Sequence, residues 1–349
     1  MTICIDGRVI GRSHSPFLIA EMSGNHNQSL ETALAIVDAA AQAGAHAIKL
    51  QTYTADTLTI NERGGSFKIN DKESLWAGQS LHDLYQKAHT PWDWHKPIME
   101  HAHELGLICF SSPFDETAVD FLEQLNVPAY KIASFENNHL PLIHKAASTG
   151  KPLIISTGMA SLGELDEAVR TARDAGCTQL MLLKCTSSYP SSPENTNIRT
   201  IPHLRQLFNC EVGLSDHTMG VGVAVASVAM GATLIEKHFT ISRSDGGVDS
   251  AFSLEPNEFS ALVLETERAW QSLGKVSYGP TDSERRSMVF RRSIYVVRDI
   301  QPGELFTPEN IRIIRPGYGA PPNLYKKIIG KTAQYPYERG TPLSLDKLL

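Results

Sequence analysis

The fold of this chain is decided by two short segments, Gly213-Leu214-Ser215-Asp216-His217-Thr218 and Ile235-Glu236-Lys237-His238-Phe239-Thr240. Each segment closes a run of strand-forming residues with a histidine. The two histidines lie 21 residues apart, which is about the length of one strand-plus-helix unit. Successive strands of a parallel barrel end at the same rim. We therefore expect His217 and His238 to lie side by side at that rim.

Two imidazoles at an open rim form a candidate metal site. Asp216, Glu236 and Asp249 lie nearby in the sequence, and histidine with carboxylate is a donor set that suits several divalent ions. The simpler alternative is that each histidine only caps its strand or pairs with a carboxylate. Spacing alone leaves both interpretations open.

Eight short apolar runs alternate with helix-like segments before Trp270. The expected strands are 17–21, 46–51, 107–111, 129–133, 152–156, 179–185, 211–215 and 233–238. Helical periodicity is visible between them, as in 29–43, 116–125 and 163–175. Eight strand-helix repeats predict a (β/α)8 barrel with a parallel sheet. A doubly wound open sheet is the alternative fold.

The pattern changes after Trp270. Residues 274–289 are rich in Gly, Ser, Pro and charge, which is typical of a linker. Residues 290–349 then show short strand-like runs that are broken by Pro-Gly and Pro-Pro pairs. We expect a barrel with a short N-terminal extension over 1–273, a linker over 274–289 and a small separate domain over 290–349.

Composition excludes several classes of protein. The 349 residues are 42% hydrophobic, enough for a large core, and carry a formal net charge of −6. No basic stripe suited to nucleic acid or to an anionic membrane is present, and no run reaches the roughly 20 apolar residues of a membrane span. Five scattered cysteines without a CxxC pair favour a reducing compartment. We expect a cytoplasmic protein that binds neither nucleic acid nor membrane.

Polar side chains gather at the expected carboxyl ends of the strands. They are Glu21, Lys49, Gln51, Ser111, Ser112, Lys131, Ser134, Ser156, Tyr189, Ser215, His217 and His238. Two lysines among hydroxyl groups suit a phosphorylated anion, because ammonium groups neutralise its charge and hydroxyls donate to its oxygens. Singly, each lysine could be a surface charge and each serine a helix cap. Together they indicate a site on the face where barrels of this type carry catalysis.

The loop after the second expected strand is long and rich in aromatic residues. Residues 54–91 and the segment that follows contain Trp76, Trp92 and Trp94. Loops in this position commonly shape substrate pockets. We expect one or more of these tryptophans to cover apolar parts of a substrate.

The ordered motifs resemble the nonulosonic (sialic-type) acid synthases. The resemblance rests on EMSGNHN (21–27), KLQ (49–51), FSSPFD (110–115), YKIAS (130–134), STGM (156–159), KCT (184–186), GLSDHT (213–218) and EKHFT (236–240). It spans the chain, because residues 290–349 look like the C-terminal antifreeze-like (SAF) domain of that family.

The resemblance implies a reaction, a metal ion and a partner. The family condenses phosphoenolpyruvate with an acylated amino-hexose to a nine-carbon 2-keto acid and releases phosphate by C–O cleavage. It uses Mn2+ or a similar divalent ion, such as Mg2+ or Co2+, and works as a domain-swapped homodimer. The base is a carboxylate or a metal-bound water, and the resemblance does not choose between them.

The resemblance also implies roles for individual residues. The metal would be held by His217 and His238. Phosphoenolpyruvate would be bound by Lys49, Ser112, Lys131, Ser134, Ser156, Ser187 and Ser215. The sugar would be bound by Glu21, Gln51, Tyr189, Asp249 and Arg315, with Arg315 supplied by the partner subunit. The catalytic set would be Glu21, Lys49, Lys131 and Asp249.

Three segments resemble the pseudaminic acid branch of the family, namely 75–85, 88–95 and 242–253. Sialic acid synthases usually carry Gly-Pro-Asp where this chain has Gly247-Val248-Asp249, and some carry asparagine where it has Ser187. The expected acceptor is 2,4-diacetamido-2,4,6-trideoxy-L-altrose, which gives pseudaminic acid. The alternatives are N-acetylneuraminic or legionaminic acid synthesis from N-acetylmannosamine or its 2,4-diacetamido-6-deoxy analogue.

Two other classes of function remain as alternatives. A metal-dependent aldolase would also use a barrel with histidines and lysines, but it would release no phosphate. A small domain of the antifreeze-like type could bind ice or only mediate assembly. Ice-binding surfaces favour flat arrays of small hydroxyl residues, whereas Thr307, Thr332 and Thr341 are irregularly spaced among charges.

Overall fold

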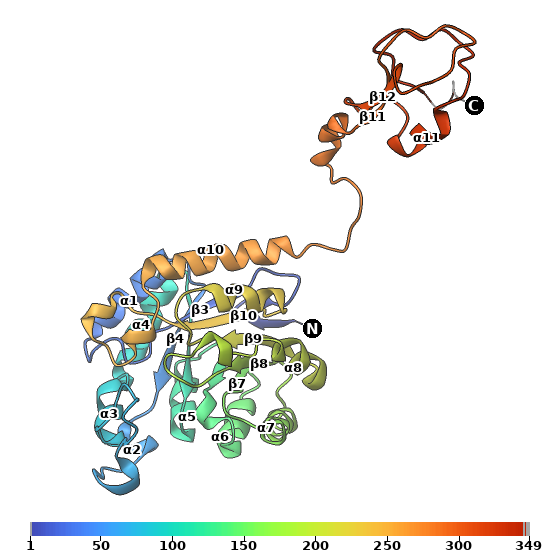
Figure 1. Ribbon diagram of the computed structural model, residues 1–349. Helices are drawn as coiled ribbons and strands as arrows, with labels where there is room; N and C mark the ends of the chain where they lie inside the picture. The colour runs from blue at the N-terminus through green and yellow to red at the C-terminus, as the bar shows by residue number, and fades with distance from the viewer. Residues whose placement is uncertain (1, 345, 347–349) are drawn as a thin grey trace. The chain divides into compact units, whose positions relative to one another are not determined.

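Eight parallel strands close into a barrel in the computed structural model, which describes residues 2–344 and 346 (Figure 1). They are β3 (Phe17–Glu21), β4 (Ala47–Thr52), β5 (Ile108–Pro113), β6 (Tyr130–Ile132), β7 (Leu153–Ser156), β8 (Leu180–Cys185), β9 (Glu211–Ser215) and β10 (Leu234–His238). β10 pairs with β3 and places His238 opposite Glu21, which closes the barrel. The predicted (β/α)8 fold is confirmed, and the open-sheet alternative is wrong.

Helices surround the barrel. They are α1 (Leu30–Gln42), α4 (Trp92–Glu104), α5 (Glu116–Gln124), α6 (Leu140–Ala147), α7 (Leu162–Asp174), α8 (Thr200–Phe208), α9 (Gly222–Ala229) and α10 (Pro256–Ser272). Local signals fix where several of them begin. Ser29 caps α1 by accepting the Thr32 N–H, and Ser161 forms a capping box with Glu164 at the start of α7. The helices expected over 29–43, 116–125 and 163–175 are confirmed.

The barrel interior is apolar at its base and polar at its rim. An N-terminal hairpin, β1 (Ile3–Ile5) and β2 (Arg8–Ile10), packs its isoleucines against the interior residues near the strand starts. Along each strand, inward side chains recur every second residue. Ile19 is therefore followed by Glu21, and Ala47 by Lys49. This change from apolar to charged positions places the functional side chains at the carboxyl ends of the strands.

The insert between β4 and α4 folds into short elements. They are α2 (Ala55–Leu58), the 3-10 helix η1 (Gly65–Phe67) and α3 (Leu81–Ala88). Of the tryptophans expected to cover a substrate, two pack elsewhere. Trp92 stacks on Phe121 with ring centroids 4.6 Å apart, and Trp94 lies edge-on to His26 at 5.6 Å. Both rings pack α4 against neighbouring segments. The expectation that they cover a substrate is therefore wrong for these two residues.

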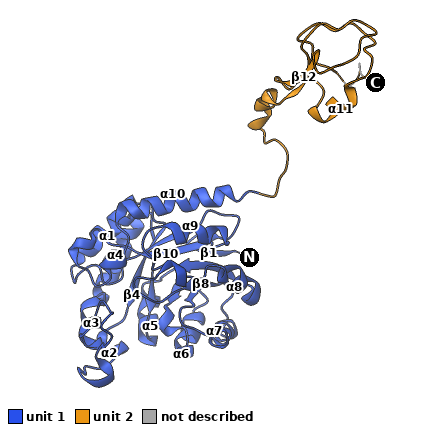
Figure 2. Ribbon diagram, viewed as in Figure 1, with its two compact units in different colours: residues 1–274 blue, residues 275–349 orange. Residues whose placement is uncertain are grey.

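The chain divides into two compact units, residues 1–274 and 275–349 (Figure 2). The second unit contains the 3-10 helix η6 (Glu284–Phe290), the antiparallel pair β11 (Ser293–Val296) and β12 (Ile311–Ile314), and α11 (Tyr325–Ile328). It has its own core, which includes Ile294, Phe306 and Ile311. Residues 345 and 347–349, at the end of the expected small domain, lie outside the described residues.

Two further expectations concern the cell. Within the described part of the chain, no helix is both long and apolar enough to cross a membrane. The five cysteines are free thiols, and Cys4 is the exposed one among them. A cytoplasmic location stays a prediction.

Candidate active site

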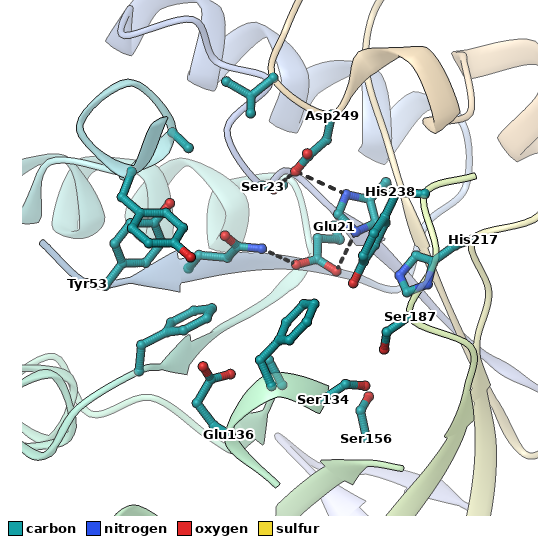
Figure 3. A pocket seen from close by; sticks show the side chains of 18 of the residues that line it. Glu21, Ser23, Tyr53, Ser134, Glu136, Ser156, Ser187, His217, His238 and Asp249 are labelled. Carbon is teal, nitrogen blue, oxygen red and sulfur yellow. Dashed lines mark hydrogen bonds and ion pairs between the residues drawn. The ribbon is translucent and has the colours of Figure 1, made fainter. Parts of the chain in front are cut away.

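A cavity of about 410 Å3 opens among the carboxyl ends of the barrel strands (Figure 3). Most of the residues singled out from the sequence line it, namely Glu21, Lys49, Gln51, Lys131, Ser134, Ser156, Ser187, Tyr189, Ser215, His217, His238 and Asp249. Ser112 lies just behind the lining, where its hydroxyl accepts from Lys49 Nζ at 3.2 Å. Arg315 belongs to the other unit. The structure thus brings the barrel residues together, while their roles stay predictions.

Two buried lysines share two buried carboxylates in the cavity. Lys49 Nζ lies 2.8 Å from Glu21 Oε1 and 3.7 Å from Glu236 Oε1. Lys131 Nζ lies 3.3 Å from the same Glu236 oxygen, to which Ser215 donates at 3.2 Å. The sequence placed Glu236 near the histidines and, by strand alternation, on the same face of its strand as His238, but it gave Glu236 no role in the site.

The contacts between Glu21 and Lys49 keep this pair ionised despite burial. Burial by itself opposes the charged form of Glu21, but Lys49, His238 and Lys131 outweigh it and hold the pKa of Glu21 below its usual range. Burial likewise opposes the charged form of Lys49, and the carboxylates of Glu21 and Glu236 overcome it and raise the pKa of Lys49. The cavity therefore presents the ammonium group of Lys49 at neutral pH.

Hydroxyl groups cluster beside the lysines. Ser134 Oγ accepts the Gly158 N–H at 3.2 Å. A side chain at Gly158 would collide with the hydroxyls of Ser187 and Ser134, so only glycine lets them approach this backbone. Ser156 Oγ is buried without a hydrogen-bond partner among the described residues. Buried hydroxyls normally find a partner, so the oxygens of a bound anion are the natural complement of this cluster.

The two histidines lie side by side, as expected from their spacing. Their ring centroids are 5.4 Å apart. His217 Nδ1 lies 2.9 Å from the Thr186 carbonyl oxygen, and a proton donated there leaves Nε2 with a free lone pair. His238 Nε2 lies 3.4 Å from Glu21, and His238 Nδ1 lies 3.7 Å from Asp249. Burial lowers the pKa of His238, which favours the neutral ring that a metal ion requires.

The residues fit an open metal site and not a closed one. Within the described residues, no three histidine, cysteine or acidic side chains converge as a ligand cluster. A metal ion held by the two imidazoles alone would keep coordination positions free for substrate oxygens or water, as catalytic sites do. Asp216 is not part of this arrangement, because its carboxylate pairs with Lys237 Nζ at 2.9 Å.

Glu136 lines the cavity and was missed by the sequence reasoning. It lies in the 3-10 turn η2 (Ser134–Glu136) after β6, where strand alternation no longer indicates which side chains face inward. Its Oε2 is buried and unpaired among the described residues. Burial raises the pKa of Glu136 to about 7, against an opposing effect of Lys131. The site thus contains a buried carboxyl group that titrates near neutrality.

The Glu136→Gln substitution should therefore stabilise the protein more at high pH than at low pH. The folded state holds the Glu136 proton up to about pH 7, whereas the unfolded chain releases it near 4.5. Stability is consequently lost as the pH rises through that window, by up to about 3 kcal/mol. Calorimetric melting of the variant should give a Tm close to wild type at pH 5 and several degrees higher at pH 8. The exposed Glu194→Gln is the matched control, and equal shifts at both pH values would refute the assignment.

The outer part of the cavity is apolar. It is lined from the insert by Leu58, Ile69, Trp76, Leu81, Leu84, Tyr85 and Ala88, and from the barrel strands and loops by Tyr53 and Phe114. Of the expected tryptophans, Trp76 is the one in the lining. Its Nε1 donates to the Val248 carbonyl at 3.1 Å, beside Asp249. The insert lies outside the strand-helix repeat of the barrel, so that repeat did not predict which of its side chains face the cavity.

Comparisons with known proteins agree with this arrangement. The NeuB family profile matches residues 36–278, and the SAF domain profile matches residues 291–349. A pseudaminic acid synthase of Campylobacter jejuni is 43% identical, with 94% of this chain and 95% of that protein aligned. One from Helicobacter pylori is 42% identical over 95% of this chain and 98% of its own length.

More distant relatives act on related sugars. An N,N'-diacetyllegionaminic acid synthase of Legionella pneumophila is 37% identical, with 95% of this chain and 94% of that protein covered. Among solved structures, an N-acetylneuraminic acid synthetase of Leptospira borgpetersenii in complex with citrate is 32% identical and superposes with a TM-score of 0.73. That match covers 82% of this chain and 95% of the other.

Proposed function

Because the chain belongs to the NeuB family, we propose that it condenses phosphoenolpyruvate with an acylated amino-hexose and releases inorganic phosphate. The observation that carries this proposal is the joint placement of Lys49, Lys131, the serine hydroxyls and the histidine pair in one cavity. The lysines and hydroxyls suit the phosphate and carboxylate of phosphoenolpyruvate. The enzyme is a transferase that forms a C–C bond.

The favoured acceptor is 2,4-diacetamido-2,4,6-trideoxy-L-altrose, and the product is then pseudaminic acid. Two features support this choice. The pseudaminic acid synthases are more similar to this chain than the legionaminic acid synthase of Legionella. The apolar outer part of the cavity also suits an acceptor with a deoxygenated C6 and two acetyl groups.

In the first step, C3 of phosphoenolpyruvate attacks the aldehyde carbon of the open-chain sugar. The C–C bond forms, the aldehyde oxygen takes up a proton to become a hydroxyl, and positive charge develops at C2. Lys49 and Lys131 hold the phosphate and carboxylate so that C3 faces the aldehyde. His217 and His238 would hold a divalent ion, with Mn2+ favoured over Mg2+ or Co2+, which would supply Lewis-acid polarisation of that aldehyde.

In the second step, water adds to C2 and loses one proton; the C2–O bond to phosphate then breaks, and the remaining hydroxyl proton passes to the departing phosphate to leave the ketone. Carboxyl groups with separated pKa values can share the proton transfers. Burial raises the pKa of Asp249, so it can hold a proton, whereas Glu21 is kept ionised by its lysine and histidine neighbours and can accept hydrogen bonds from the sugar hydroxyls. Gln51 donates to Glu21 at 2.7 Å and keeps that carboxylate in position.

We also propose a domain-swapped homodimer in which the SAF domain of one subunit serves the barrel of the other. Charge supports this arrangement. Residues 275–349 carry 13 Lys and Arg against 7 Asp and Glu, so the remaining residues carry 19 against 31. A basic small unit and an acidic barrel unit are electrostatically complementary. Arg315 would then reach the sugar of the partner subunit.

A panel of acceptors tests the proposed reaction. Purified enzyme is incubated with phosphoenolpyruvate, Mn2+ and either the trideoxy-altrose, its legionaminic acid counterpart or N-acetylmannosamine, and the products are weighed by mass spectrometry. We expect the trideoxy-altrose to give the highest kcat/KM, with one phosphate released per product. A higher kcat/KM for N-acetylmannosamine would overturn the acceptor and leave the family reaction standing. Condensation without phosphate release would instead support the aldolase alternative.

A further inference from the structure

The two ends of the cavity differ in chemistry. The two lysines, the two histidines, Glu21 and Asp249 lie together in the cavity, and Figure 3 shows Tyr53 at the other end of the view from His217. If the aldehyde carbon reacts beside the histidines, the far end of the sugar chain extends toward the outer, apolar end. This step rests on the proposed function. The group that meets the apolar end is then the one at C6.

One face of α3 builds much of that end. Leu81, Leu84, Tyr85 and Ala88 all line the cavity, and their spacing of three, four and seven residues places them on a single face of the helix. Ile69 extends the same surface from the preceding loop. We call Ile69, Leu81, Leu84, Tyr85 and Ala88 the insert wall. Its aliphatic members offer no hydrogen bond to a substrate.

The insert wall is held against the barrel at both ends of α3. Ser80 caps the helix by accepting the Asp83 N–H at 3.1 Å. At the other end, Gln28 Nε2 donates to the carbonyl oxygens of Lys87 at 3.0 Å and His89 at 2.7 Å. A Cβ on Gly24 would lie 3.0 Å from the Ala88 backbone, so the helix packs closely on this glycine. The wall is therefore a fixed surface and not a mobile flap.

Aromatic rings support the wall from behind. Tyr53 is 3% exposed and meets Tyr85 and Phe114 edge-on, at centroid distances of 6.0 and 5.0 Å. In the neighbouring turn, the Trp76 backbone N–H donates to Ser74 Oγ and Trp76 Nε1 donates to the Val248 carbonyl, so neither N–H is free for a substrate hydroxyl. A hydroxyl placed against Ile69, Leu81 and Leu84 would give up its hydrogen bonds to water without replacement.

We infer that the insert wall determines substrate specificity by selecting a methyl group over a hydroxymethyl group at C6 of the acceptor. The methyl group buries apolar surface against the wall, whereas the hydroxymethyl group must be desolvated there. An apolar pocket discriminates an added hydroxyl by on the order of a hundredfold at most. We therefore expect the full-length enzyme to prefer the 6-deoxy acceptor over its 6-hydroxy analogue by roughly 10- to 100-fold in kcat/KM.

The test compares 2,4-diacetamido-2,4,6-trideoxy-L-altrose with 2,4-diacetamido-2,4-dideoxy-L-altrose in wild type and in four variants of the full chain. Ile69→Asn and Leu81→Asn alter half-buried wall positions. Leu75→Asn is the matched control, since Leu75 belongs to the same insert, is 48% exposed and does not line the cavity. Both wall variants should lower the kcat/KM ratio at least about fivefold, with KM for phosphoenolpyruvate unchanged. The Leu81→Met variant should restore the ratio, because it restores an apolar contact of similar size.

Each outcome has a separate meaning. An unchanged ratio in both wall variants, with melting temperatures close to wild type, would overturn the inference. A ratio that falls equally in Leu75→Asn would also overturn it, because the effect would then come from the insert as a whole. If wild type used N-acetylmannosamine better than either altrose, the proposed acceptor would be wrong, whatever the wall variants did.

Discussion

Replacing His217 or His238 with alanine is expected to lower kcat by at least about two to three orders of magnitude. Metal assistance at a carbonyl contributes several kcal/mol, and each 1.36 kcal/mol is a factor of about ten in rate. The two rings converge in the cavity, and the Thr186 carbonyl orients His217. Neither ring has a neighbouring side chain that could replace it as a nitrogen ligand among the described residues lining the cavity.

The measurement has two readouts. Chelated wild type should lose turnover and regain it with Mn2+, and inductively coupled plasma mass spectrometry should find about one metal per site in wild type and far less in each variant. The exposed His203→Ala on α8 is the matched control and should retain both metal and activity. Full activity of the variant with both His217 and His238 replaced by alanine, measured after exhaustive chelation, would show that the reaction does not need the proposed metal ion.

The strands and the histidine pair could be predicted because both follow from a period. Strand alternation places every second side chain on one face, so Lys49 with Gln51 and Glu236 with His238 could be paired before the barrel was seen. The 21-residue spacing of the histidines matched one strand-helix unit, and β9 and β10 are indeed neighbours. The positions of side chains in a regular element can therefore be predicted from the sequence.

The residues that were missed lie outside the strand-helix repeat of the barrel. Glu136 follows β6 in a 3-10 turn, and the insert wall comes from a segment whose short helices have no counterpart in the barrel repeat. Trp92 and Trp94 were attractive candidates because large aromatic rings often contact ligands, yet burial against Phe121 and His26 satisfies them equally well. Tertiary packing decides between these uses of a ring, and a single sequence does not contain that choice.

The two lysines show that a sequence can indicate a binding site without indicating the ion pairs within it. Two cations at strand ends indicated an anion site, but the sequence did not reveal that Lys49 and Lys131 would share Glu236. This sharing has a consequence for binding. In the proposed reaction, phosphoenolpyruvate would compete with the resident carboxylates for the ammonium groups, so part of its affinity would depend on how Ser215 and Gln51 hold those carboxylates.

The second large effect is expected at Arg315. In the proposed dimer this exposed arginine serves the sugar in the barrel of the partner subunit, so Arg315→Ala should chiefly impair use of the acceptor, with a raised KM for the sugar and a lower kcat. Arg312→Ala is the matched control, because Arg312 is exposed on the neighbouring strand β12 of the same unit. It should leave both parameters close to wild type.

Complementation between two inactive variants makes the argument decisive. Arg315→Ala subunits keep an intact barrel, and His217→Ala subunits keep an intact small domain. In an equal mixture after subunit exchange, half of the dimers are mixed, and one of the two sites in each mixed dimer combines both intact residues. Activity should therefore recover to about a quarter of the wild-type value and should scale with the fraction of mixed dimers. If exchange is verified by native mass spectrometry and no activity returns, Arg315 does not act across subunits, and the domain-swapped arrangement fails.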